Sequence, residues 1–105
     1  MLVHIVLWNF KSDLSEIEQQ EGAKKIKDGL EHLTKSIPEI LKIEVGFNAL
    51  NAPMENHQIS LYTEFDSMDS LLIYQKHPDH LSVGKIIKHY TQERICIDYN
   101  VERKD

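Results

Sequence analysis

A tyrosine and two histidines lie close together in the segment YQKHPDH, residues 74–80, and these side chains suit acid–base chemistry. If Tyr74 ends one helix and His80 lies in the first turn of the next, the turn between them folds the two rings toward each other. Burial and a helix N-terminus both disfavour the imidazolium, which keeps His80 neutral at pH 7. A neutral histidine can take a proton from a carbon acid, while a tyrosine hydroxyl donates to the developing enolate oxygen. The segment therefore predicts enolisation or aldol chemistry on a small keto compound, without metal or nucleotide.

The same residues also have a purely structural interpretation. His80 would then be a core histidine, and the Tyr74 hydroxyl would reach water at a helix end. His77 is expected to cap the third helix, because it precedes Pro78 and must be extended. His77, Asp79 and His80 crowd together, but no fourth ligand stands at a fixed spacing and the chain has one cysteine. We therefore predict no metal.

The elements that position this segment follow from hydrophobic periodicity. Residues 2–10 predict a strand, and Ser15 with Glu18 forms a capping-box pattern at the start of a helix. The apolar stripe of this helix runs until Pro38 ends it and consists of Ala23, Ile26, Leu30, Leu33 and Ile37. Alternating patterns predict strands over 40–50 and 58–65, and residues 94–101 predict the last strand.

Two shorter helices are expected between the last two strands. The first has Asp66 or Ser67 as its N-cap and ends near His77. Its predicted buried stripe consists of Met68, Leu71 and Leu72. Pro78 suits the first position of the next helix, on which one face is formed by His80, Val83, Gly84 and Ile87. The order β-α-β-β-α-α-β predicts an α+β, ferredoxin-like fold with a four-stranded antiparallel sheet.

The first strand is apolar on both faces. One face carries Val3, Ile5 and Leu7, and the other carries His4, Val6, Trp8 and Phe10. Helices on one face of a four-stranded sheet leave the other face bare, so the second apolar set needs a cover. A second copy of the chain, packed sheet to sheet, is the simplest cover and predicts a homodimer. The alternative is a strand that is partly wet on one side.

The composition narrows the class of protein. The 105 residues predict one domain, 1–105, and the net charge of −5 argues against a nucleic-acid partner. The apolar start, MLVHIVLWNF, is too short to span a bilayer, so we predict no membrane partner. The single Cys96 fits a reducing compartment, which predicts a cytoplasmic protein. We interpret Cys96 as a small core residue, and Asp98 either orients a histidine or faces solvent.

Four segments resemble the stress-responsive A/B barrel domain family, also called the dimeric α/β barrel or Dabb family. They span residues 3–99 and read HIVLW, IPEILKIEVGFN, FDSMDSLLIYQKHPDH and ICIDY. The resemblance implies a ferredoxin-like protomer whose sheets pair into a dimeric barrel. Some members are plant proteins that accumulate under stress, and one is a plant polyketide cyclase that performs an aldol condensation without metal or cofactor.

The resemblance to the cyclase also implies site residues. Its catalytic tyrosine and histidine correspond to Tyr74 and His80, and a histidine near its pocket corresponds to His4. Two positions depart from the cyclase: Leu30 replaces an aromatic residue that shapes its pocket, and Trp8 enlarges a pocket-side position. Whether His4 faces the pocket stays open, because the first strand has apolar residues on both faces.

Three functions compete at this point. The first is a binding module that holds an aromatic or keto ligand in a cavity lined by His4, Val6, Trp8, Tyr74, His80 and Ile87. The second is a cofactor-free enzyme that uses Tyr74, His80 and His4 in the same cavity for proton transfer, cyclisation or isomerisation. The third is a structural stress protein whose relevant property is a stable dimer. None of the three requires a cofactor.

Overall fold

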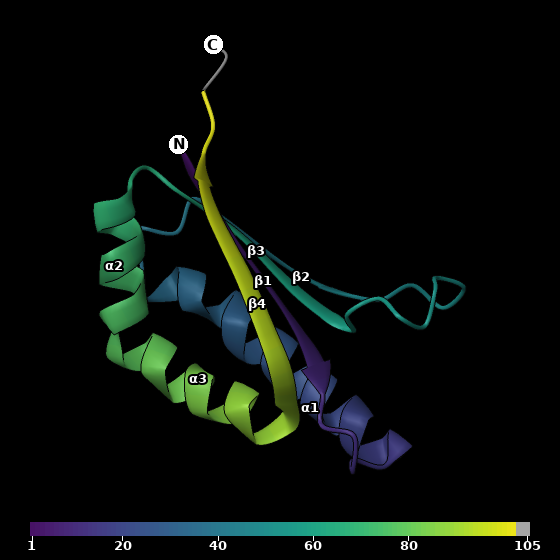
Figure 1. Cartoon of the computed structure of the whole chain (residues 1–105). Helices are drawn as coiled ribbons and strands as arrows, with labels where there is room; N and C mark the ends of the chain where they lie inside the picture. The colour runs from purple at the N-terminus through teal and green to yellow at the C-terminus, as the bar shows by residue number, and fades with distance from the viewer. Residues whose placement is uncertain (103–105) are drawn as a thin grey trace.

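The computed structural model describes residues 1–102 and contains one four-stranded antiparallel sheet with its helices on one face (Figure 1). The strands lie in the order β2-β3-β1-β4 and comprise β1 Leu2–Phe10, β2 Lys42–Phe47, β3 Ile59–Phe65 and β4 Thr91–Asn100. The helices are α1 Glu16–His32, the short 3-10 helix η1 Leu33–Lys35, α2 Met68–Lys76 and α3 Pro78–Tyr90. The predicted ferredoxin-like fold of the α+β class is confirmed. Residues 103–105 of the predicted domain lie outside the described residues.

Helix α1 begins as predicted and ends earlier than predicted. The Glu18 backbone N–H donates to the Ser15 hydroxyl at 3.1 Å, and the Glu18 carboxylate accepts from the Ser15 N–H at 3.0 Å, which completes the capping box. The expected helix up to Ile37 is wrong, because the chain tightens into η1 after His32. Pro38 excludes helical dihedrals at Ile37, so the backbone has to leave the helix before this residue. The Ile37 side chain is nevertheless completely buried.

The two helices after β3 meet at His77. The Asp79 backbone N–H donates to His77 Nδ1 at 3.1 Å, and Pro78 is the first residue of α3, so the predicted cap is confirmed. On α2, Ser67 is the N-cap and the buried residues are Leu71 and Tyr74. The predicted stripe is therefore partly wrong. It places Met68 and Leu72 in the core, and both are exposed. Leu72 lies about 100° around the helix from Leu71 and so faces away from the core.

Strand boundaries also differ from expectation, by one residue for β3 and by more for β2 and β4. β2 spans six residues at the edge of the sheet, fewer than the predicted 40–50. In it Val45 is buried, Ile43 is partly buried and Phe47 is exposed, and Leu41, just before the strand, is exposed as well. Its predicted apolar face therefore reaches the core only in the middle. β4 starts at Thr91 rather than at residue 94, and Thr91 is buried.

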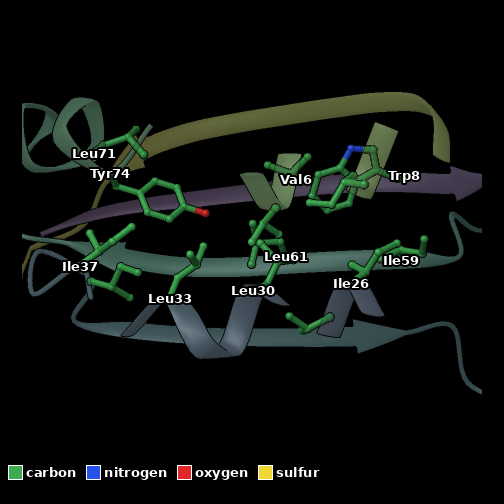
Figure 2. Packing of buried hydrophobic residues seen from close by; sticks show 14 of the residues in the cluster. Val6, Trp8, Ile26, Leu30, Leu33, Ile37, Ile59, Leu61, Leu71 and Tyr74 are labelled. Atoms are coloured by element: carbon green, nitrogen blue, oxygen red, sulfur yellow. The ribbon is translucent and has the colours of Figure 1, made fainter. Parts of the chain in front are cut away.

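The core fills the layer between the sheet and the helices (Figure 2). β1 contributes its even-numbered residues, so His4 lies on the helix side together with Val6 and Trp8, and its side chain is only 3% exposed. The orientation of His4 that the sequence leaves open is therefore toward the helices. In Figure 2 the Tyr74 hydroxyl points away from Leu71 toward the middle of this layer.

A β-bulge interrupts the pairing of β1 with β4. Leu7 pairs with Ile95, but Asn9 pairs with Gln92, so β4 holds one extra residue in this stretch. Glu93 lies in the bulge with φ of 57°, and it is the one residue other than glycine with positive φ among those described. The Asn9 side-chain amide donates to the Glu93 carboxylate at 2.7 Å and ties the bulge to β1.

The face of the sheet opposite the helices is apolar along β1 and β4. Register places Ile5 beside Ile97 and Leu7 beside Ile95 on this face, and the side chains of Ile95 and Ile97 are more than half exposed. We call this set, together with Tyr99, the outer apolar face. No helix within residues 1–102 has the length and apolar character needed to cross a membrane.

Candidate functional site

A cavity of about 170 Å³ opens between β1, α3 and the start of β4. Its apolar wall consists of Val6, Trp8, Leu30, Leu61 and Ile87. Gly84 lies in the same wall. The polar side chains of the wall are those of His4, Gln75, His80, Lys88 and Arg94. The cavity therefore combines a mostly apolar interior with a small number of polar groups, which is the usual composition of a small-molecule site.

Tyr74 lies directly behind this wall. Its ring is 4.4 Å from the His80 ring and 5.1 Å from the Phe65 ring, measured between centroids, and its side chain is fully buried. Among residues 1–102, its hydroxyl has no hydrogen-bond partner. Burial raises the pKa of Tyr74 far above its ordinary value, so the hydroxyl keeps its proton and is available as a donor.

His80 is held in one tautomer by the end of α2. Its Nδ1 lies 3.1 Å from the Gln75 carbonyl oxygen. Because a carbonyl only accepts, Nδ1 carries the hydrogen and Nε2 of the neutral ring is an acceptor. Burial is the main cause that lowers the pKa of His80 below 6.5, so the ring is neutral at pH 7. A neutral imidazole with a free Nε2 lone pair can act as a base.

His4 is oriented by a carboxylate. The register of β1 with β4 places His4 opposite Asp98, and His4 Nδ1 donates to the Asp98 carboxylate. Thr63 donates its hydroxyl hydrogen to the His4 carbonyl at 3.0 Å and holds the backbone there. The His4 ring meets the Tyr74 ring edge-on at 6.4 Å. Of the two interpretations of Asp98, the structure therefore selects the one in which it orients a histidine. Tyr74, His80 and His4 form one group of rings, which we call the ring cluster.

Cys96 does not complete a nucleophilic triad. It is exposed on β4, so its interpretation as a core residue is wrong. Its Sγ lies 3.6 Å from His4 Nδ1, the same nitrogen that donates to Asp98. A histidine that links a thiol to a carboxylate needs them on opposite ring nitrogens. Partial burial also raises the pKa of the thiol, which disfavours the reactive thiolate.

Two groups of side chains bear on metal binding. His4 Nδ1, Cys96 Sγ and an Asp98 oxygen lie within 4.8 Å of one another and could hold a metal ion, the one such group that residues 1–102 contain. The hydrogen bond between His4 and Asp98 already uses two of these three ligand atoms. In the other group, which the sequence singles out, His77 Nδ1 accepts from the Asp79 N–H and His80 Nδ1 is bound to Gln75. That second set therefore does not converge on one ion.

A family model described as the stress responsive A/B barrel domain matches residues 2–101, nearly the whole chain. The chain belongs to the stress responsive A/B barrel domain family. A comparison of its sequence with curated proteins finds no match.

Solved structures share the fold of this A/B barrel chain. A dimeric protein of unknown function from Bacteroides fragilis is 37% identical, with a TM-score of 0.88 and 95% of each chain covered. A dimeric ferredoxin-like protein from Thermobifida fusca is 22% identical, with a TM-score of 0.81 and 95% of this chain and 90% of that chain covered. A hydroxynitrile lyase from Passiflora edulis is 19% identical, with a TM-score of 0.78 and 99% of this chain and 95% of that chain covered.

The A/B barrel fold brings most of the predicted site residues together. Those that line the cavity are His4, Val6, Trp8, His80 and Ile87, whereas Tyr74 lies behind the wall against His80. Sequence reasoning missed three polar residues of the wall, which are Gln75, Lys88 and Arg94. One signal for Arg94 was present, because it has the same parity on the last strand as Cys96 and Asp98. Lys88 follows Gly84 by four residues on the predicted cavity face of its helix.

Proposed function

We propose that this protein binds a small aromatic or keto ligand in the cavity beside the ring cluster. The observation that carries the proposal is an apolar cavity whose wall includes two histidines, each held by a hydrogen bond at Nδ1. The buried Tyr74 hydroxyl supports it, because an unsatisfied buried donor costs about 1–3 kcal/mol and a ligand oxygen that enters past His80 would satisfy it.

The test uses Trp8, the single tryptophan of the chain, as a reporter inside the cavity. Acetophenone, an aromatic ketone, should shift the NMR signal of the Trp8 indole N–H in a saturable manner. Tyr74→Phe and His80→Gln should each weaken this binding about five- to tenfold, which is the loss of roughly one hydrogen bond. Tyr62→Phe is the matched control, since its partly buried hydroxyl donates to Glu64 at 2.7 Å and Tyr62 pairs with Ile5 on the face of the sheet opposite the cavity.

Folding of the variants has a clear expectation. Tyr74→Phe removes an unpaired buried hydroxyl, so its stability should equal or exceed that of the wild type. The proposal is wrong if millimolar acetophenone leaves the Trp8 signal unchanged, or if folded Tyr74→Phe and His80→Gln both bind as the wild type does.

Catalysis of proton transfer by the same site is a second candidate function, favoured by the tautomer and lowered pKa of His80. His80 Nε2 would take a proton from the carbon next to a carbonyl, the C–H electron pair would move to the carbonyl oxygen, and Tyr74 would donate to that oxygen. The hydroxynitrile lyase from Passiflora edulis shows that this fold can house an enzyme. At 19% identity it is evidence for the shared fold and not for a shared reaction. Enolisation would appear as deuterium uptake by the acetophenone methyl group in D₂O, lost in His80→Gln.

We also propose that the protein is a homodimer through the outer apolar face. Ile95 and Ile97 are more than half exposed beside Ile5 and Leu7, and an exposed apolar set of this kind marks a protein–protein interface. The relative from Bacteroides fragilis, at 37% identity, is described as dimeric. A second exposed apolar region is the loop between β2 and β3, which extends from the body (Figure 1). Its Leu50 and Met54 are both at least 95% exposed.

A further inference from the structure

The polar groups at the cavity have an uneven charge. The wall includes the cations of Lys88 and Arg94 and no aspartate or glutamate. The whole chain has the opposite bias, with 17 acidic against 12 basic residues. Within residues 1–102, neither Lys88 nor Arg94 has a carboxylate within ion-pair distance. Two exposed cations thus border an apolar cavity in an acidic protein, and neither is paired with a carboxylate within residues 1–102.

The backbone of β4 is specifically shaped beside Arg94. Glu93 and Arg94 together stand opposite Trp8, because the bulge inserts one extra residue between the pairs at Leu7 and Asn9. The left-handed conformation of Glu93 costs about 1–2 kcal/mol in a residue with a Cβ. Bulges often aim a side chain into a site, and strained backbone is concentrated at functional positions. Here the bulge shifts Gln92 and Thr91 relative to β1, so that Thr91 returns to the core, while Arg94 keeps the face that it shares with Cys96, Asp98 and the cavity.

Two titratable side chains sense the charge of Arg94, and these are His80 and Cys96. His80 is neutral, and the positive charge of Arg94 is one of the smaller causes that lower its pKa. Asp98, on the same strand, is bound to His4. The guanidinium therefore has no competing anion within the wall, and its planar donors match the two oxygens of a carboxylate.

From the proposed binding function, on which this inference rests, we infer a narrower ligand class, a monocyclic aromatic carboxylate. Its ring would lie against Val6, Trp8 and Ile87, and its carboxylate would bind Arg94, with Lys88 adding positive charge. The cavity volume of about 170 Å³ suits this size, since an apolar cavity of about 150 Å³ takes up one benzene molecule. Arg94 would then determine specificity for an acid over its neutral analogue.

The experiment compares benzoate with its neutral isostere benzamide, again through the Trp8 indole signal. The wild type should bind benzoate more tightly than benzamide, and added salt should weaken benzoate alone. Arg94→Gln should weaken benzoate binding about five- to tenfold and change benzamide binding less than twofold. Arg94→Lys should fall between, because it keeps the charge and loses the paired hydrogen bonds. Lys85→Gln is the matched control, an exposed lysine of α3 outside the wall.

Each contrary result has a separate meaning. If the wild type binds benzamide as tightly as benzoate, recognition of an anion is wrong and the cavity proposal stands. If Arg94→Gln, with an unchanged melting temperature, binds benzoate like the wild type, the assignment of Arg94 is wrong. If neither compound nor acetophenone shifts the Trp8 signal, both this inference and the proposed function are wrong.

Discussion

At the scale of single residues, His4 and His80 face one cavity but are held in different ways. His4 is nearly fully buried and donates to a carboxylate, whereas His80 is half-buried and donates to a main-chain carbonyl. Burial lowers the pKa of His80, and its Nε2 is left as an acceptor, so His80 is the neutral base of the proposed site.

The lowered pKa of His80 predicts a specific loss of stability in acid. As the pH falls through about 6.5, the ordinary value, the unfolded chain binds a proton on His80 that the folded protein does not yet accept. The free energy of unfolding should therefore decrease from pH 7.5 to pH 5.5 more steeply in the wild type than in His80→Gln. Urea unfolding at several pH values measures both curves, and the other five histidines are common to the two proteins. Parallel curves would contradict the burial of a neutral His80.

The sequence brings residues of the candidate site together where residue types are distinctive, and it does not where strand register decides their neighbours. Tyr74, His77 and His80 could be found because a proline between them determines the local backbone. The contact between His4 and Asp98 joins residues 94 positions apart, and it exists only because of the β1–β4 register. Arg94 has the parity of Cys96 and Asp98, but alternation alone does not show which face of the last strand turns toward the helices, because this strand is exposed along most of its length.

At the scale of elements, the packing of α1 on α3 depends on a glycine. A Cβ on Gly22 would lie 2.6 Å from Cδ1 and 2.8 Å from Cγ of Tyr90, whose ring is buried. By contrast, a Cβ on Gly84 of α3 would meet nothing within 4 Å, because that position opens onto the cavity. Gly22 thus allows α1 and α3 to pack closely, and Gly84 leaves space in the cavity.

The two glycines predict opposite effects of the same substitution. Gly22→Ala should destabilise the protein by about 1–3 kcal/mol, since overpacking outweighs the helix propensity gained. Gly84→Ala should be neutral or stabilising by up to about 1 kcal/mol, and it should weaken acetophenone binding because the methyl group occupies cavity space. Urea unfolding and the Trp8 titration measure these effects. A Gly22→Ala variant at least as stable as the wild type would contradict the close contact with Tyr90.

Helix starts were easier to predict than helix ends and buried faces. The capping box at Ser15 and the proline after His77 are local signals, and both helices begin where these signals place them. Ile37 continues the apolar spacing of α1 although its backbone has left the helix. A side chain is buried when it points into the core, whether or not its own backbone is helical. Leu72 is apolar yet exposed, because the orientation of a nine-residue helix is decided by its neighbours.

At the scale of the whole molecule, one face of the sheet is covered by helices and the other is exposed. The helix side holds the core, the cavity and the ring cluster, while the other side offers Ile95, Ile97 and Tyr99 to its surroundings. Apolar burial of about 25 cal/mol per Å² makes such a face a driving force for association. Association through it would leave the cavity wall on the helix side free for a ligand.

The outer apolar face predicts the oligomeric state and a way to change it. Sedimentation equilibrium at micromolar concentration should give twice the 12.3 kDa mass of one chain. Ile97→Lys should shift the protein toward the monomer, because it places a charge in the middle of the paired faces without disturbing the core of one subunit, where Ile97 is 57% exposed. Ile17→Lys is the matched control, since Ile17 is 68% exposed on α1 and should leave the dimer intact. A monomeric wild type, or an Ile97→Lys variant that dimerises as tightly as the wild type, would show that this face stays in water.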